Sequence, residues 1–181
     1  STAPSPPEPT GPSGPASQRL RALKERISRI EQGGSNGRHP RVLPLGLPEV
    51  DDSLPLGGLP FGAVHELAGR GALRLGLMLL SRLDGPVLWC RQGRHGGQPY
   101  GPGLAEAGLR TERLLFALAA RPQDLLWSME EGLRTGSVAA VIAEIRDTID
   151  LTASRRLQLS AENGGSIGLV LGSGGEKAHG P

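Results

Sequence analysis

Between residues 63 and 171 the chain alternates short apolar runs with longer segments of helical periodicity, and this alternation constrains its fold most strongly. Short apolar runs bounded by Gly, Pro or polar residues are typical of strands, whereas apolar residues spaced three or four apart are typical of helices. Strands joined by helices form a mostly parallel sheet with helices on both faces. The sequence therefore predicts an α/β fold, with strands at 63–68, 87–90, 114–118, 138–145 and 167–171 and helices at 73–83, 103–108, 122–135 and 152–163.

The clearest strand and the clearest helix are neighbours in the sequence. Residues 138–142 are apolar without interruption, as expected for a central parallel strand that is buried on both faces. The helix predicted at 122–135 has Pro122 in its first turn, a position that tolerates proline, and Gly136 at its end. Its apolar face comprises Leu125, Leu126, Met129 and Leu133, with Glu130 and Glu131 outside that face.

Composition distinguishes both ends of the chain from this core. Residues 1–16 contain six prolines and one charged residue, too little apolar surface to offset the entropy of ordering. Residues 172–181 are rich in Gly and unpatterned, and because they follow directly on a strand we expect a longer natural chain to continue there. The expected organisation is a disordered tail (1–16), a basic helix (17–34), a linker (35–41), a core (42–171) and a flexible C-terminal tail (172–181).

Residues 17–34 predict a basic amphipathic helix that is separable from the core. Ser17 suits its N-cap, and two glycines end it. Seven basic residues against two glutamates give the segment 18–41 a net charge of +5. A narrow apolar stripe of this kind packs either on its own domain or on a partner helix, and the pattern does not decide between them. The stripe is formed by Leu20, Leu23, Ile27 and Ile30.

The loop after the first core strand has the layout of a phosphate-binding loop without its chemistry. A functional loop follows GxxxxGK[ST], in which the Lys neutralises the outer phosphates and the hydroxyl holds magnesium. Counted from Gly69, Arg74 stands in place of the second Gly, Leu75 in place of the Lys and Gly76 in place of the hydroxyl. Arg70 and Arg74 remain as candidates for a phosphate contact at the helix N-terminus, although an Arg in a first helical turn is usually solvated.

The remaining residues indicate no metal site, disulfide or membrane segment. Cys90 is the single cysteine and lies in an apolar run, so we expect a buried, unreactive thiol. The histidines are scattered, and His65 is expected to make a structural hydrogen bond within its strand. Trp89 and Trp127 are expected in the core. No apolar run approaches the roughly 18 residues of a membrane span, which predicts a soluble cytoplasmic protein.

Several motifs resemble known sequences. The run VDDSLPLGGLPFGAVHEL at 50–67 resembles the entry to the core of the RecA recombinase. From about residue 18 to 171 the chain more closely resembles the ImuA family, RecA-like proteins of bacterial mutagenesis operons. The motifs that carry this resemblance are RLRALKERI, LPFGAVHE, EEGLRTG and LTASRRLQL, in that order.

The resemblance implies a RecA-like core preceded by an N-terminal helix, and it locates the positions of RecA's catalytic groups. The P-loop Lys corresponds to Leu75 and the magnesium-binding hydroxyl to Gly76. RecA's catalytic Glu falls in the stretch 88–92, where Gln92 cannot act as a general base. The Asp that orients magnesium corresponds to Glu144, a carboxylate one methylene longer. Losing Lys, hydroxyl and base together predicts a protein with no ATPase activity and no bound cofactor.

By implication of the same resemblance, the chain is an accessory protein of DNA-damage-induced mutagenesis and translesion DNA synthesis within the SOS response. Its expected partner is an ImuB-type protein, with RecA and an error-prone DNA polymerase as further candidates. In RecA the N-terminal helix packs on the neighbouring subunit. The stripe of Leu20, Leu23, Ile27 and Ile30 is therefore the candidate surface for a partner or for self-association.

Two alternatives stay open from the sequence. One is a nucleotide-dependent RecA-like ATPase with a divergent P-loop, in which another Lys or Arg does the work of the missing Lys. The other is a DNA-binding module that uses the basic segment and arginines of the core. The candidate DNA contacts are Arg91 and Arg94 in a polar loop and Arg155 and Arg156 on a helix, where adjacent arginines usually face solvent.

Overall fold

A computed structural model describes residues 41–93, 99–145 and 147–172. The chain divides into two units, Ser1–His39 and Pro40–Pro181, and all described residues belong to the second unit. The predicted tail at 1–16, the basic helix at 17–34 and nearly all of the linker at 35–41 lie outside the described residues, as do residues 173–181.

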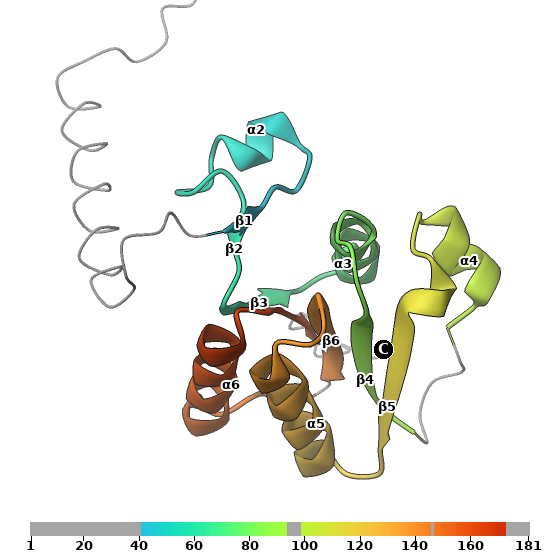
Figure 1. Cartoon of the computed structure of the whole chain (residues 1–181), viewed down its shortest axis with the longest axis vertical. Coiled ribbons are helices and arrows are strands. Elements are labelled where there is room, and N and C mark those ends of the chain that lie inside the picture. Colours follow the sequence, from blue (N-terminus) through green and yellow to red (C-terminus); the bar gives the residue numbers. More distant parts are fainter. Residues whose placement is uncertain (1–40, 94–98, 146, 173–181) are drawn as a thin grey trace, which may run out of the picture. The chain divides into compact units, whose positions relative to one another are not determined.

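A five-stranded sheet forms the centre of the second unit (Figure 1). All neighbouring strands run parallel, in the order β3-β7-β6-β4-β5, so β3 and β5 are the edge strands and β6 is central. The predicted parallel α/β sheet is confirmed. Its strands are β3 (Ala63–Leu67), β4 (Val87–Gln92), β5 (Leu114–Ala119), β6 (Ala140–Ile145) and β7 (Ile167–Gly172).

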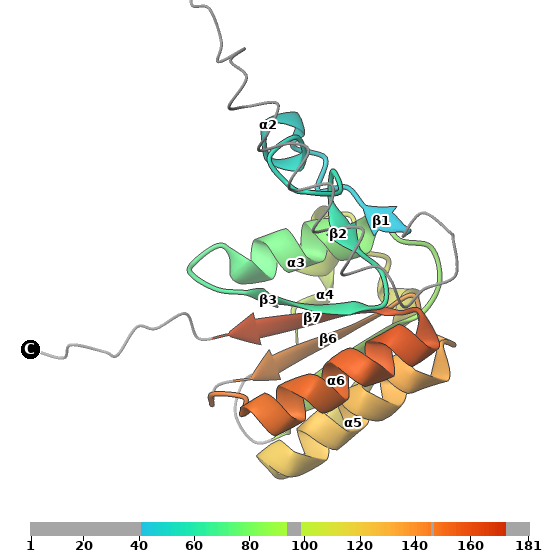
Figure 2. The same cartoon turned by 90° about the vertical axis from the view of Figure 1, so that its left-hand side faces the viewer.

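Helices cover both faces of this sheet (Figure 2). On one face lie α3 (Ala72–Ser81) and α4 (Gly101–Glu106), and on the other lie α5 (Pro122–Thr135) and α6 (Leu151–Gly164). Each face has its own apolar cluster, and the adjacent β6 residues Val141 and Ile142 belong to opposite clusters because strand side chains alternate in direction. Residues 140–143 are fully buried, as predicted for a central parallel strand.

The predicted strands and helices from residue 63 onward are present, with ends within two residues of those expected. The apolar face of α5 packs on the sheet through Leu125, Met129 and Leu133, as predicted. The prediction for Trp127 was wrong, because its side chain is 61% exposed whereas Trp89 is 1% exposed. Trp127 lies two positions from both Leu125 and Met129, which turns it roughly 200° away from the buried face.

Sequence reasoning missed several of the smaller elements, at residues 48–60 and 111–113. An antiparallel pair, β1 (Val42–Leu43) and β2 (Leu59–Pro60), encloses the short helix α2 (Pro48–Asp51). The carboxylate of Asp51 accepts hydrogen bonds from the amides of Leu45 at 2.7 Å and Gly46 at 2.9 Å. A further one-turn 3₁₀ helix precedes β5 at Thr111–Arg113. Helix α2 and the 3₁₀ helix rest on local hydrogen bonds and are too short to show a hydrophobic period.

Within the described parts of the chain, no helix is both long and apolar enough to cross a membrane.

The end of α6 meets the end of α5 at two consecutive glycines that serve different purposes. A Cβ atom on Gly164 would lie 1.9 Å from the carbonyl oxygen of Leu133, so only glycine allows the two helix backbones to approach this closely. Gly165 has open space around it but a φ of 64°, and its amide donates to the carbonyl of Ala161 at 2.8 Å. Gly165 therefore ends α6 in the left-handed conformation that glycine adopts most readily.

We predict that Gly164→Ala destabilises the domain more than Gly165→Ala. The first substitution forces two backbones apart and is expected to cost about 3 kcal/mol, as in overpacked cores. The second adds only the penalty of a left-handed alanine, about 1 kcal/mol. Urea denaturation followed by circular dichroism measures both losses, and equal losses would contradict this account of the helix contact.

Candidate functional site

The candidate site lies at the carboxyl ends of the parallel strands, where open α/β sheets usually bind their ligands. The chain places the residues singled out by sequence at three of these ends. The glycine-containing loop 68–71 follows β3, Arg91 and Gln92 end β4, and Glu144 lies one residue before the end of β6. The geometry of each position shows what chemistry remains there.

The loop after β3 is a tight turn closed by its own backbone. Gly69 has a φ of 95°, which favours glycine. Its carbonyl accepts a hydrogen bond from the amide of Ala72 at 3.1 Å, and the carbonyl of Gly71 accepts from Leu75 at 2.9 Å. Gly71 is the N-cap of α3 and provides no side-chain cap. The turn thus holds its shape through backbone hydrogen bonds.

The two positions that correspond to the P-loop Lys and hydroxyl face the packed interior. Leu75 is half-buried and packs against the apolar cluster beneath α3. Gly76 is buried, and a Cβ atom there would lie 3.4 Å from side-chain carbons of both Ile142 and Leu171. Any side chain at position 76 therefore begins in apolar contact with the sheet. Arg74, at the position of the second P-loop Gly, is exposed on the first turn of α3.

Glu144 is held by two side chains of the neighbouring strand β4. Its Oε1 atom accepts hydrogen bonds from Trp89 Nε1 at 2.9 Å and from Arg91 Nε at 2.6 Å. Its Oε2 atom accepts from Arg91 Nη2 at 3.3 Å. The pairing of β4 with β6 explains this arrangement, because alternation puts Trp89, Arg91 and Glu144 on the same face of the sheet.

This cluster places a cation against the strand-end carboxylate. The Arg91 side chain is 11% exposed and that of Glu144 34% exposed, so the ion pair is largely shielded from water. Two-point contact between a guanidinium and a carboxylate is stronger and more directional than a single hydrogen bond. Because both carboxylate oxygens are engaged, a magnesium ion would have to compete with Arg91 for Glu144.

The rest of the strand-end region assembles no metal centre among the described residues. No group of three or more His, Cys, Asp or Glu side chains there could hold a metal ion. Gln92, the position expected from the resemblance to match RecA's catalytic Glu, is half-buried at the end of β4. Arg94 lies outside the described residues, so its predicted role stays a prediction.

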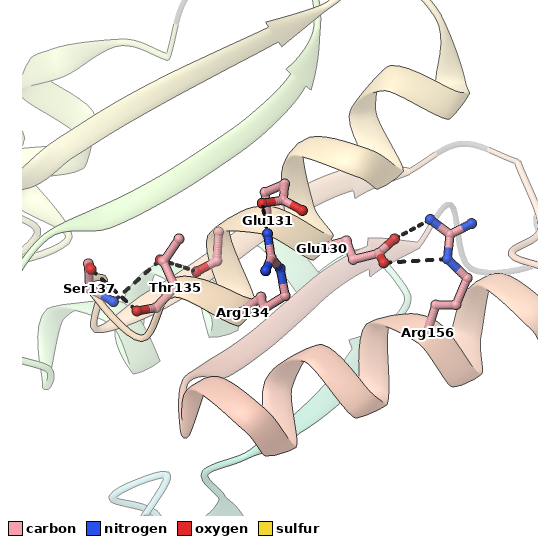
Figure 3. A network of polar contacts seen from close by, with 7 residues as sticks. Glu130, Glu131, Arg134, Thr135, Ser137 and Arg156 are labelled. Carbon is pink, nitrogen blue, oxygen red and sulfur yellow. Dashed lines mark hydrogen bonds and ion pairs between the residues drawn. The ribbon is translucent and has the colours of Figure 1, made fainter.

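The described arginines among the predicted DNA contacts lie in two separate places. Arg91 shares the sheet face of Trp89, which α3 covers. Arg155 and Arg156 belong to α6, which covers the opposite face (Figure 2). Arg156 of α6 forms an ion pair with Glu130 of α5 (Figure 3). Within α5, Arg134 pairs with Glu131, three residues earlier. Arg155 is exposed. The ion pair of Arg156 links the two helices of that layer.

Two structural predictions are confirmed. The Nε2 atom of His65 lies 3.0 Å from the carbonyl oxygen of Pro60, a local structural hydrogen bond. Cys90 is buried, and burial raises the pKa of its thiol to about 12, which keeps it protonated and unreactive. The interaction that sequence reasoning missed is the contact of Trp89 and Arg91 with Glu144. A Trp-x-Arg spacing at the end of one strand and a Glu at the end of another was the available signal, but strand order was needed to join them.

Fold and strand-end geometry together define a parallel α/β domain with helices on both faces, in which the carboxylate at the end of the central strand is paired with an arginine of the same chain. The crystal structure of SulA from Pseudomonas aeruginosa has a similar fold. The TM-score is 0.50 at 22% sequence identity, over 62% of this chain and 97% of the SulA chain. No protein-family profile matches the chain.

Sequence comparison identifies the relatives. The chain is 36% identical over 142 residues to the protein ImuA of Caulobacter vibrioides, in two strains of that bacterium. The match covers 72% of this chain and 57% of ImuA. The resemblance to ImuA is therefore confirmed, and the chain is a homologue of ImuA over the matched region. It spans little more than half the length of these relatives.

We predict that the Arg91–Glu144 pair contributes measurably to stability. Arg91→Met leaves a shielded carboxylate without its cation and should cost about 2 kcal/mol. The matched control is Arg121→Met, which removes an exposed arginine from its pair with Asp124 and should leave stability unchanged. Urea denaturation of both variants, monitored by Trp89 fluorescence in a Trp127→Phe background, provides the comparison. An equal response of the two variants would show that the half-buried Arg91–Glu144 pair contributes no more to stability than an exposed pair does.

Proposed function

We propose that this chain is a non-catalytic accessory protein of DNA-damage-induced mutagenesis and translesion DNA synthesis, which acts by binding other proteins. The homology to ImuA supports the biological process. We further propose that its sheet is a RecA-like core, in which β3 and the loop after it correspond to the P-loop strand and turn of RecA. The parallel sheet and the position of that loop before α3 support this assignment.

The main support for the non-catalytic proposal is the ion pair between Arg91 and Glu144. In phosphoryl transfer the strand-end carboxylate orients magnesium, and the metal neutralises charge that develops on the phosphates. Here an arginine of the neighbouring strand holds that carboxylate, while Leu75 and Gly76 offer neither a phosphate clamp nor a metal ligand. We therefore propose that the residues of the strand-end region serve packing and stability rather than nucleotide chemistry.

Protein binding is the function that such a domain retains. A fold can lose its chemistry and keep the surfaces by which its subunits contact one another. We propose an ImuB-type protein as the principal partner, with RecA and an error-prone DNA polymerase as further components of the same assembly. The docking element we propose is the basic amphipathic segment 17–34, because its stripe of Leu20, Leu23, Ile27 and Ile30 offers apolar contact within a cationic surface.

The non-catalytic proposal predicts that the protein does not hydrolyse ATP. The purified protein should show no turnover above buffer, with or without DNA, and restoring Lys and Thr at positions 75 and 76 should not create any. Leu75→Lys with Gly76→Thr leaves Glu144 paired with Arg91, so the metal site is still incomplete. A sensitive phosphate-release assay decides this, with a RecA-family ATPase as the positive control. DNA-stimulated turnover by the unaltered protein would refute the non-catalytic proposal.

The second prediction concerns the docking segment. Leu23→Glu with Ile27→Glu should weaken capture of an ImuB-type partner by about tenfold or more, because two charges replace apolar contacts. The matched control is Ala22→Glu with Ser28→Glu, which adds the same charge outside the stripe. Pull-down from DNA-damaged cells and circular dichroism of the purified variants measure binding and folding. Equal capture by both double variants would assign the docking surface elsewhere.

A further inference from the structure

Strand β5 ends the sheet on one side and pairs only with β4 among the described strands. The amide of Gly93 donates to the carbonyl of Ala119 at 3.0 Å, so the backbone of Ala119 faces β4. In a parallel pair, alternate residues direct their backbone groups to the same neighbour. The N–H and C=O groups of Phe116 and Leu118 therefore point away from the sheet, where another strand could pair with them.

The side chains of this edge strand are apolar and largely exposed. The sequence Leu114-Leu115-Phe116-Ala117-Leu118-Ala119 contains no charge and no proline. Leu115 is 51% exposed, Phe116 46% and Leu118 66%, although Phe116 stacks on the buried Trp89 with ring centroids 6.0 Å apart. Edge strands of natural proteins are normally protected by charges, prolines or a covering segment. An uncharged apolar edge is therefore an association site.

The opposite edge of the same sheet is protected. Strand β3 carries the exposed Glu66. The side-chain amide of Gln158 on α6 accepts a hydrogen bond from the Val64 amide at 3.1 Å and donates to the Gly62 carbonyl at 3.3 Å. Gln158 thus engages backbone groups at the start of β3, and Glu66 places a charge on the same strand. The contrast between the two edges locates association at β5.

We infer that two copies of this chain associate by pairing their β5 strands antiparallel, about a two-fold axis at Ala117. In this register Phe116 of one copy lies opposite Leu118 of the other, so the residues with outward backbone groups exchange hydrogen bonds. Their exposed side chains cover one another on one face of the joined sheet, and on the other face Leu115 lies opposite the small Ala119. The strand is self-complementary in hydrogen bonding, in side-chain size and in its lack of charge, as an isologous two-fold contact requires.

A contact confined to one strand buries less area than the roughly 1,600 Å² of a standard interface. We therefore expect a weak dimer whose population depends on protein concentration. The dimer joins the two five-stranded sheets into one continuous sheet.

Sedimentation of the full chain over a range of micromolar concentrations tests the association. The unaltered protein should shift from monomer to dimer, and Leu118→Lys should raise the dissociation constant at least about tenfold, because the two-fold axis brings both lysines into the contact. The matched control is Leu159→Lys, which changes an exposed leucine on α6, the helix that contacts β3. Its dimer should form as in the unaltered protein. Circular dichroism checks that both variants are folded.

Disulfide cross-linking tests the register. At the two-fold axis, Ala117 of one copy lies opposite Ala117 of the other. Two Ala117→Cys side chains should therefore oxidise to a covalent dimer, while Leu159→Cys should not. The native thiol of Cys90 is buried and does not compete. The proposal is overturned if the unaltered protein stays monomeric, if Leu118→Lys leaves the dimer intact, or if both cysteine variants cross-link equally. It is also overturned if Leu23→Glu with Ile27→Glu abolishes the dimer, which would assign self-association to the segment 17–34.

Discussion

The structure depends on one constraint, which is that a parallel sheet must be covered on both faces. Parallel strands need crossover connections, and the helices in those connections pack on the sheet. Strand β6 lies at the centre and has residues 140–143 fully buried, with Ile142 facing the α3 layer and Val141 the α5–α6 layer. Close packing of these layers explains why glycines occur where helix meets sheet or helix meets helix, as at Gly76 and Gly164.

The same geometry brings the strand ends together and so creates the environment of Glu144. A carboxylate at this place needs a counter-charge because it is partly removed from water. In a nucleotide-binding protein a metal ion supplies that charge, whereas this chain supplies it with Arg91, assisted by the indole of Trp89. The residue is thus stabilised without any ligand, and the neighbouring Leu75 and Gly76 are free to serve packing. This pairing is the physical basis of our proposal that the chain acts by binding other proteins.

A sheet whose two faces are covered by helices still has two edge strands, and in this protein the side chains of the two edge strands differ. Gln158 and Glu66 protect β3, while β5 has exposed apolar side chains and, among the described strands, pairs only with β4. An unprotected edge is a liability in a protein that works alone. In a protein whose work is to contact other chains, the same edge becomes a functional surface. The proposed loss of nucleotide chemistry at the strand ends and the proposed association through β5 are therefore consistent with one another.

Sequence alone determined the fold class, the succession of strands and helices from residue 63 onward, and the departure of residues 69–76 from the P-loop motif, because hydrophobic period and motif residues are local properties. It also identified Glu144, Arg91 and Gln92 as residues of interest. It misjudged Trp127, whose exposure depends on its rotation around α5, and it missed α2, which rests on a few hydrogen bonds to Asp51. Only the tertiary structure decided that β4 lies beside β6, and hence that Arg91 neutralises Glu144, and that β5 lies at an open edge. Strand order brings together residues far apart in the chain, and no local pattern encodes it.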